Sequence, residues 1–478
     1  METPVKQGPD FYLTLLTLGV ILLLLLPELV KDGMFADGVL YAAVARNEAH
    51  GLGSCWFPRF SETIFIPFFH QQPPLTFWIL SLFYRVLGDS MYTERIYSLC
   101  CALISGGLIS AVWKTVHNGN SILRKQSWLP VLFWIITPVC FYSFRNNLEE
   151  NSLSVFTLLA LLLIIHSLKK KPVLFLFSGA CAIVLAMLCK GLPGLYPLAF
   201  PFLYWLVLRT IPFTTMLIRS LQLLVFILIL LFLLWLWPDA RMSLGAYLHD
   251  RLLNSILHVD TGQGRLHLLV QLLADLGIPF LAGLLLYSLG SGKAFLSLLP
   301  KKMEQKNALL FFLLGLCASL PLMVTREQRW FYTVPAIPAF GLAFSFLTAE
   351  GIHHGTKRIT SQRSIQLLRF ITGGFLVFVI GFAAVQVGKI RQDEETDIHD
   401  TYLLGKAIPV GSTVNSFPYT YNNWALQQYL NRYFGLSVTS TSEPLLYFIT
   451  DRTQHQHPGM EYEKLELGTR QYDVYKHR

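Results

Sequence analysis

The chain has 478 residues, of which 53% are hydrophobic and 14% are charged, and its formal net charge is +9. This composition is typical of a multi-pass membrane protein and excludes an ordinary soluble domain. The excess of Lys and Arg is what cytoplasmic loops carry, so it does not indicate a nucleic-acid partner. Of the 7 Cys, only Cys55 lies outside an apolar segment, so neither a disulfide framework nor a zinc cluster is expected.

Apolar segments of membrane-spanning length recur along residues 1–388. The first, 11–30, follows Lys6 and lacks a small-residue cleavage site, so we expect a retained signal anchor. The full set predicts about eleven crossings, or about twelve to thirteen if further segments also cross. The segments after the first are 92–116, 128–143, 151–168, 172–189, 192–208, 214–237, 268–290, 308–324, 332–348 and 367–388.

Clusters of Lys and Arg fall in alternate loops of this pattern, which makes those loops cytoplasmic. If the N-terminus is cytoplasmic as well, only two crossings precede Lys114, and the shorter apolar segment 74–87 should lie along the membrane surface or re-enter. Residues 31–95 then form one long external loop, and the C-terminus is also external. The mostly short loops fit a bacterial inner (plasma) membrane.

The composition changes near Gly388, where the apolar segments end. Residues 389–478 are polar and predict a small extracytoplasmic α/β domain with one modest core. The expected strands are 414–417, 445–450 and 472–475, and the expected amphipathic helix is 421–434. The predicted fold class is therefore an all-α polytopic membrane domain, residues 1–388, followed by this small domain.

The external loop 31–95 places ionisable groups and a Pro-Pro pair at membrane level, where they are costly without a function. Asp37 is the candidate catalytic base, and Tyr41 and Arg46 are candidates for binding the substrate. The competing interpretation is that Asp32 and Asp37 are solvated acids that cap the helix expected to begin near Gly38. Capping does not exclude catalysis.

The next two external loops carry further candidates for the functional site. Arg145, Glu149 and Glu150 stand directly before an apolar segment and are candidates for binding the substrate, although acids in the first turn also suit the helix dipole. Lys190 is a lone cation between two apolar segments, and a positive charge on this side of the membrane favours an anionic ligand, such as the phosphate of a donor. A Lys that snorkels to the interface is the alternative.

Two Arg and three aromatic side chains lie at the start of the apolar segment 332–348. The guanidinium groups of Arg326 and Arg329 match phosphate, and Tyr332 can stack on a sugar or anchor at the interface. An ordinary aromatic belt with loop cations is the rival interpretation. The loop 238–267 carries Asp, Arg, Tyr and His side chains, a mixture that can bind phosphate or a metal, but no ligand spacing in it is diagnostic.

Acids thus occupy the first two external loops, and cations dominate the later ones. An enzyme with a lipid-phosphate donor needs this division, because cations stabilise the departing phosphate and a carboxylate takes the proton of the acceptor hydroxyl. A flippase or exporter of lipid-linked sugars would instead place its charges near the bilayer midplane. A non-catalytic scaffold that presents the C-terminal domain to partners is a further alternative.

Several short stretches of the membrane part carry a resemblance to a known family. They are Asp37–Asn47, Gln72–Trp78, Gly88 with Arg95 and, with less specificity, 145–151, Lys190-Gly191 and 329–338. This pattern resembles the GT-C glycosyltransferases, and the protein O-mannosyltransferases and the lipid A aminoarabinose transferases are the most similar groups.

The resemblance implies a membrane glycosyltransferase that moves a sugar from a polyprenyl- or dolichyl-phosphate carrier to an acceptor hydroxyl. The reaction would take place on the outer (periplasmic) face of the membrane, with inversion at the sugar carbon. Carried over by position, Asp37 would be the general base, Glu149 or Glu150 would match the acid of the second external loop, and Lys190 and Arg329 would bind the donor phosphate. The partners would be the lipid-linked sugar and an acceptor that is a lipid, a glycan or a protein.

Two departures from the family pattern qualify this expectation. Gly38 follows the candidate base where many relatives have Glu, which indicates a different acceptor. Gln71 and Gln72 precede the Pro-Pro pair where metal-binding relatives have an acid. We therefore assign no metal ligand and leave a divalent-metal cofactor open.

Overall fold

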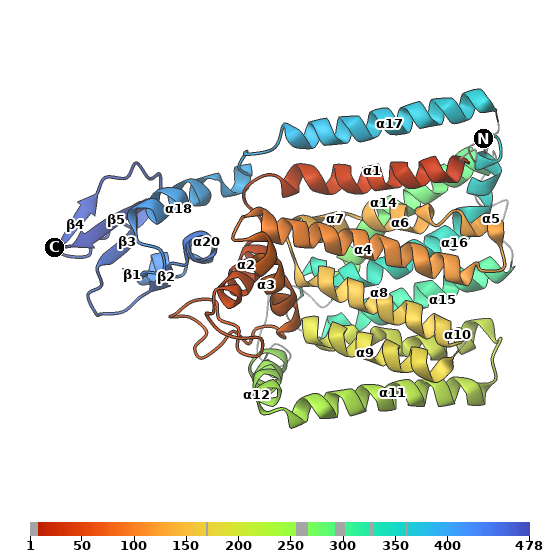
Figure 1. The fold of residues 1–478 in the computed structure, drawn as a ribbon, viewed down its shortest axis with the longest axis horizontal. Helices are drawn as coiled ribbons and strands as arrows, with labels where there is room; N and C mark the ends of the chain where they lie inside the picture. Colours follow the sequence, from red (N-terminus) through yellow and green to blue (C-terminus); the bar gives the residue numbers. More distant parts are fainter. Residues whose placement is uncertain (1–7, 169–170, 255–265, 292–301, 325–327, 360) are drawn as a thin grey trace.

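The computed structural model describes residues 8–168, 171–254, 266–291, 302–324, 328–359 and 361–478. Long helices run side by side in a bundle, and a small C-terminal sheet lies beyond one end of it (Figure 1). Helices α2 (Ala36–Ala49) and α3 (Leu75–Leu87) lie at that same end, whereas the first helix, α1, begins at the opposite end. We call the end with α2, α3 and the sheet the first-loop end.

Nine helices in the described part of the chain are long and apolar enough to cross a membrane, and a bent pair can bring this number to ten. These spans are formed by α1 (Pro9–Leu29), α4 (Tyr92–Val116), α8 (Glu149–Ser167), α9 (Pro172–Lys190), α11 (Phe213–Leu236), α14 (His267–Ser291), α15 (Lys302–Ser319) with η4 (Leu320–Val324), η5 (Trp330–Ala336) with α16 (Ile337–Thr356), and α17 (Gln362–Ala384). The predicted fold class, a helical multi-pass membrane protein with a small C-terminal α/β unit, is confirmed.

Two of the expected spans differ from a straight helix. The segment 192–208 is a shorter apolar unit made of η1 (Leu192–Ala199) and α10 (Phe200–Leu208). The segment 128–143 is two helices, α6 (Trp128–Ile135) and α7 (Pro138–Arg145), which are bent by 76°. Pro138 explains the break, because it lacks an amide donor and favours an extended conformation at Thr137.

Short elements join the long helices. They are α5 (Ser121–Arg124), α12 (Pro238–Ala246), the π-helical turn η2 (Tyr247–Leu253) and η6 (Gln392–Glu394). The long α11 brings the chain back to the first-loop end, where α12 lies (Figure 1), and η2 follows α12 along the chain.

Helix α3 packs beside α2 at the first-loop end and is shorter than a membrane span. Its inner face buries Phe77 and Leu80, and its outer face exposes Trp78 and Val86. An apolar outer face on a helix at the end of a bundle suits the membrane interface, and the surface position of 74–87 stays a prediction.

The C-terminal unit is a five-stranded sheet in the order β2-β1-β3-β5-β4, in which β1 is parallel to β2 and β3 while β5 is antiparallel to β3 and β4. Its elements are α18 (Glu395–Ala407), β1 (Thr413–Ser416), α19 (Pro418–Tyr421), α20 (Trp424–Phe434), β2 (Ser437–Thr439), β3 (Tyr447–Asp451), η7 (Arg452–Gln454), β4 (Tyr462–Leu465) and β5 (Tyr472–His477). The three expected strands correspond to β1, β3 and β5, and the expected helix corresponds to α19 and α20.

Buried ion pairs join this unit to the first loop. Arg432 on α20 is 2% exposed, and its guanidinium lies 2.7 Å from Asp89 Oδ1 and 2.9 Å from Glu94 Oε2. Asp89 also accepts a hydrogen bond of 2.8 Å from Arg46. Since charged groups are buried only when they are paired, these contacts fix α20 against the loop that carries α2 and α3.

Candidate functional site

The centre of the candidate site is a buried cluster of two carboxylates and one ammonium group. Lys190 Nζ lies 2.6 Å from Glu150 Oε1 and 3.7 Å from Glu149 Oε2. Both glutamates are 0% exposed and Lys190 is 8% exposed. The same ammonium lies 4.9 Å from the centre of the Tyr332 ring, a distance that suits a cation–π contact.

The order of α8 and α9 along the chain explains this cluster. Helix α8 begins at Glu149 and α9 ends at Lys190, and the two helices pack against each other. A short connection makes them antiparallel, so the start of α8 meets the end of α9. Acids at a helix start and a cation at a helix end also match the helix dipoles.

The first turn of α2 packs against the turn between α7 and α8. The Phe35 amide donates a hydrogen bond of 2.8 Å to Asn146 Oδ1, and the Asn147 side-chain amide donates one of 3.5 Å to the Gly38 carbonyl. The helix, expected from the sequence to begin near Gly38, begins two residues earlier at Ala36, and Phe35 occupies the N-cap position. Since a Phe side chain cannot accept a hydrogen bond from the backbone in the manner of an N-cap residue, other contacts must fix where this helix starts.

Gly38 is required by this close approach. A Cβ atom at Gly38 would lie 1.9 Å from the carbonyl oxygen of Asn146, which is backbone and cannot move aside cheaply. We expect Gly38→Ala to lower the free energy of unfolding by about 1–3 kcal/mol, because it overpacks this contact. Thermal unfolding of the purified protein measures the effect.

Gly245→Ala is the matched control, because Gly245 also lies in a helix and has open space where its Cβ would be. Ala at such a position should be neutral or slightly stabilising. An equal unfolding temperature for Gly38→Ala and the wild type would show that the contact with Asn146 is not tight.

Asp37 and Tyr41 on α2 lie close to the cluster. The pKa of the Tyr41 hydroxyl is raised well above its ordinary value, first by burial and then by the negative charges of Glu149 and Asp37. Three carboxyl groups, Asp37, Glu149 and Glu150, therefore share one neighbourhood with the ammonium group of Lys190.

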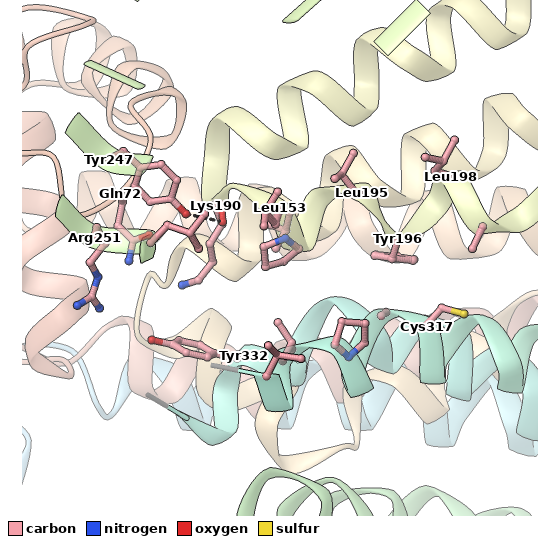
Figure 2. A pocket seen from close by; sticks show the side chains of 18 residues that line it. Gln72, Leu153, Lys190, Leu195, Tyr196, Leu198, Tyr247, Arg251, Cys317 and Tyr332 are labelled. Carbon is pink, nitrogen blue, oxygen red and sulfur yellow. Dashed lines mark hydrogen bonds between the residues drawn. The ribbon is translucent and has the colours of Figure 1, made fainter. Parts of the chain in front are cut away.

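A cavity of about 650 Å³ opens beside this cluster (Figure 2). Its polar end carries Gln72, Lys190, Tyr247, Arg251 and Tyr332, and the rest of it runs along apolar side chains of η1, α15 and η4. The apolar wall consists of Leu153, Leu192, Pro193, Leu195, Leu198, Ala199, Leu252, Ala318, Pro321, Leu322 and Val324, together with Tyr196 and Cys317. A space with a cationic end and a long apolar body can hold an anionic lipid.

The structure brings together most of the residues that the sequence selected and separates others. Lys190 and Tyr332 line the cavity, and Glu149 and Glu150 contact Lys190. Asp37 and both glutamates lie close enough to Tyr41 for their negative charges to raise the pKa of its buried hydroxyl. These residues come from α2, α8, α9 and η5.

Two predicted binding residues make other contacts. Arg46 pairs with Asp89 at the border with the C-terminal sheet, and the Arg145 guanidinium donates a hydrogen bond of 2.5 Å to the Leu24 carbonyl on α1. Arg329 is exposed, and Arg326 lies outside the described residues.

Sequence reasoning did not assign Gln72, Tyr247 and Arg251 to the site. Gln72 directly precedes the Pro-Pro pair, and this position is a signal that could have been used. Tyr247 and Arg251 lie on η2, in a loop without hydrophobic periodicity, and the sequence carries no signal that places this turn against Lys190. Among the described residues, no group of three or more His, Cys, Asp and Glu is arranged to hold a metal ion.

Comparison with known proteins agrees with this architecture. Residues 71–237 match the family model described as dolichyl-phosphate-mannose-protein mannosyltransferase. Among curated proteins no sequence matches the chain.

Solved structures give a match along nearly the whole chain. The crystal structure of ArnT from Cupriavidus metallidurans bound to undecaprenyl phosphate has a TM-score of 0.64 and 12% identity, and the match covers 96% of this chain and 97% of ArnT. The apo state of the same protein has a TM-score of 0.63 and 13% identity, with 97% of each chain covered. At such identities the likeness shows the fold alone. This chain is thus a multi-pass membrane protein of the GT-C fold, similar in structure to ArnT and, over residues 71–237, similar in sequence to the dolichyl-phosphate-mannose-protein mannosyltransferases.

Proposed function

We propose that this protein is a glycosyltransferase that moves a sugar from a polyprenyl-phosphate carrier to an acceptor hydroxyl at the first-loop end of the bundle. The observation that carries the proposal is the elongated cavity, whose polar end holds Lys190, Arg251 and two tyrosines and whose body is apolar. The phosphate of the carrier fits the polar end, and its isoprenoid chain fits the apolar wall. The ArnT structure with undecaprenyl phosphate and the family match to mannosyltransferases support this choice of donor.

In the proposed reaction Asp37 is the general base. Its carboxylate takes the proton of the acceptor hydroxyl while the hydroxyl oxygen forms a bond to the anomeric carbon of the sugar. The bond from that carbon to the phosphate oxygen breaks, and the polyprenyl phosphate leaves with the electron pair. Attack from the side opposite to the leaving phosphate inverts the configuration at the carbon.

Cations at the polar end stabilise the negative charge that grows on the phosphate. Arg251 and Lys190 line this end, and Tyr247 and Tyr332 supply hydroxyl groups beside them. Arg329 is proposed to bind the phosphate as well, on the basis of its position in the sequence alone. Glu149 and Glu150 hold the ammonium of Lys190, which fixes its position before the donor arrives.

The orientation in the membrane follows from the arrangement of the two ends. The first loop and the C-terminal sheet lie at the end of the bundle opposite to the start of α1 (Figure 1). With a cytoplasmic N-terminus, as the positive-inside rule favours, the site faces the periplasm of an inner membrane and the acceptor is a lipid, glycan or protein of the cell envelope.

The direct test is transfer of a labelled sugar from a polyprenyl-phosphate donor by the purified protein in proteoliposomes. A panel of donor sugars, mannose and aminoarabinose among them, should contain one that the wild type transfers. If the panel gives no transfer while the lipid-linked sugar is moved across the bilayer, the glycosyltransferase proposal is wrong and the flippase alternative replaces it.

Arg251 provides a specific test of the donor site. We expect Arg251→Gln to raise the KM for the donor about tenfold or more, since a charge-assisted hydrogen bond to phosphate contributes about 1.5–3 kcal/mol. Initial rates of transfer at several donor concentrations give the measurement.

Arg209→Gln is the matched control, because Arg209 follows α10 and stacks on Trp205 away from the cavity. An unchanged donor KM in Arg251→Gln would remove Arg251 from the donor site.

A further inference from the structure

The segment 32–35, between α1 and α2, is held by the C-terminal sheet unit. The Tyr429 hydroxyl on α20 accepts a hydrogen bond of 3.1 Å from the Met34 amide and donates one of 3.0 Å to the Met34 carbonyl. Met34 is 2% exposed and Tyr429 is 1% exposed, so both bonds are shielded from water. Bonds of this kind at a buried backbone fix its position, because leaving either group unpaired is costly.

Asp32, at the start of the same segment, is fixed by backbone and side chain together. Its amide donates to the Lys389 carbonyl at 2.8 Å, and its carbonyl accepts from the Arg391 amide at 2.9 Å. Its carboxylate accepts hydrogen bonds from the hydroxyls of Tyr402, at 2.8 Å, and Tyr433. Both tyrosines belong to the C-terminal unit, so the carboxylate of Asp32 binds the segment 32–35 to that unit.

Asn146 holds the other side of the segment. Its side-chain oxygen accepts from the Phe35 amide at 2.8 Å and from the Arg391 guanidinium at 2.9 Å. One side-chain oxygen, Asn146 Oδ1, therefore joins three segments. They are the turn between α7 and α8, the segment 32–35 and the chain that leads into the C-terminal unit.

We propose that the C-terminal unit positions the catalytic base, with Tyr429 as the positioning residue. Asp37 stands three residues after Met34, in the first turn of a helix whose N-cap residue, Phe35, has no side-chain acceptor. The start of α2 is consequently set by the segment before it, and Tyr429 bonds both backbone groups of Met34 in that segment. This inference rests on the proposed function, since it concerns the base of that reaction.

The other end of α2 is also tied to α20. The Asn47 side-chain amide donates a hydrogen bond of 2.8 Å to Asn431 Oδ1, and Asp89 links Arg46 to Arg432. Contacts near both ends of α2 thus attach it to α20, one helix of the C-terminal unit. The unit thereby orients the base relative to the donor cavity, without contributing any of the residues that line the cavity.

Tyr429→Phe tests the proposal by removing the hydroxyl and keeping the ring. We expect kcat for transfer to fall about tenfold to a hundredfold while the donor KM stays within twofold, because a small displacement of a base costs rate and leaves the donor cavity intact. Amide hydrogen exchange of a peptide spanning 32–38 should become faster, because the Met34 amide loses its acceptor.

Tyr462→Phe is the matched control. Tyr462 is also buried in the C-terminal unit, and its hydroxyl donates a hydrogen bond of 2.8 Å to the Leu445 carbonyl, away from the segment 32–35. It should reproduce any general loss of stability, with kcat and the exchange of 32–38 unchanged.

The outcomes separate this inference from the proposed function. Wild-type transfer together with an unchanged kcat in Tyr429→Phe would overturn the positioning role and leave the glycosyltransferase proposal standing. Equal losses of kcat in Tyr429→Phe and Tyr462→Phe would also overturn it, because the effect would then be a general one. A further outcome is that the wild type transfers no sugar while amide hydrogen exchange at 32–38 still becomes faster in Tyr429→Phe and not in Tyr462→Phe. In that case Tyr429 does fix the segment before α2, but the chemistry assigned to Asp37 is wrong.

Discussion

Replacing Asp37 with Asn is expected to lower kcat for sugar transfer by about a thousandfold, within the range that positioned proton transfer contributes to catalysis. Asn has nearly the same shape as Asp, so the first turn of α2 keeps its contacts with the turn that holds Asn146. What it lacks is a group that can take the proton of the acceptor hydroxyl. The measurement is transfer of labelled sugar in proteoliposomes under saturating donor.

Donor binding in the Asp37→Asn protein should match the wild type, and titration with the polyprenyl phosphate alone checks this. Asp239→Asn is the control, since Asp239 is an exposed acid in the first turn of another helix at the first-loop end, α12. Full activity of Asp37→Asn would place the base elsewhere, and Glu149 and Glu150 would then be the groups to change next.

Replacing Lys190 with Met is expected to destabilise the protein by about 3–5 kcal/mol and to abolish transfer. The ammonium is the cation next to two carboxylates that are 0% exposed, and removing one partner of a buried pair leaves a buried charge without compensation. Thermal unfolding in detergent and the recovered fraction of folded protein report the loss of stability.

A second variant separates the structural effect from the catalytic one. Combining Lys190→Met with Glu150→Gln removes one of the stranded charges and should restore part of the stability without restoring transfer. Lys114→Met, on an exposed side chain of α4, should change neither property. If Lys190→Met alone were as stable as the wild type, the carboxylates would not depend on this ammonium.

The membrane spans were predicted because they follow from local rules, and the same rules would have placed the central cluster, although the contact between the glutamates and Lys190 was not among the predictions. A run of about 20 apolar residues spans a bilayer, and consecutive spans with a short connection are antiparallel. The start of α8 and the end of α9 must then meet, which places Glu149 and Glu150 beside Lys190. The bend between α6 and α7 was missed because the apolar run is continuous there, although Pro138 marks the break.

The remaining parts of the site depend on contacts that no local pattern records. Arg251 reaches the cavity only because η2 turns back toward the bundle after α12. Strand β2 spans three residues, too few for an alternating pattern to be recognised, and β4 has the charged residues Glu463 and Lys464 in succession, so its sequence does not alternate. The bonds between Met34 and Tyr429 join residues 395 positions apart.

That separation has a consequence for how the protein is made. Ribosomes add about 5–20 residues per second, so Tyr429 follows Met34 out of the ribosome by about 20 to 80 s. During that interval the start of α2 has its contacts with the membrane helices but lacks those with α20. The nascent chain thus gains the geometry proposed for catalysis only when synthesis is nearly finished, and a chain released before Tyr429 carries every residue that lines the cavity while the proposed base, Asp37, lacks the contacts that α20 makes with the segment before it.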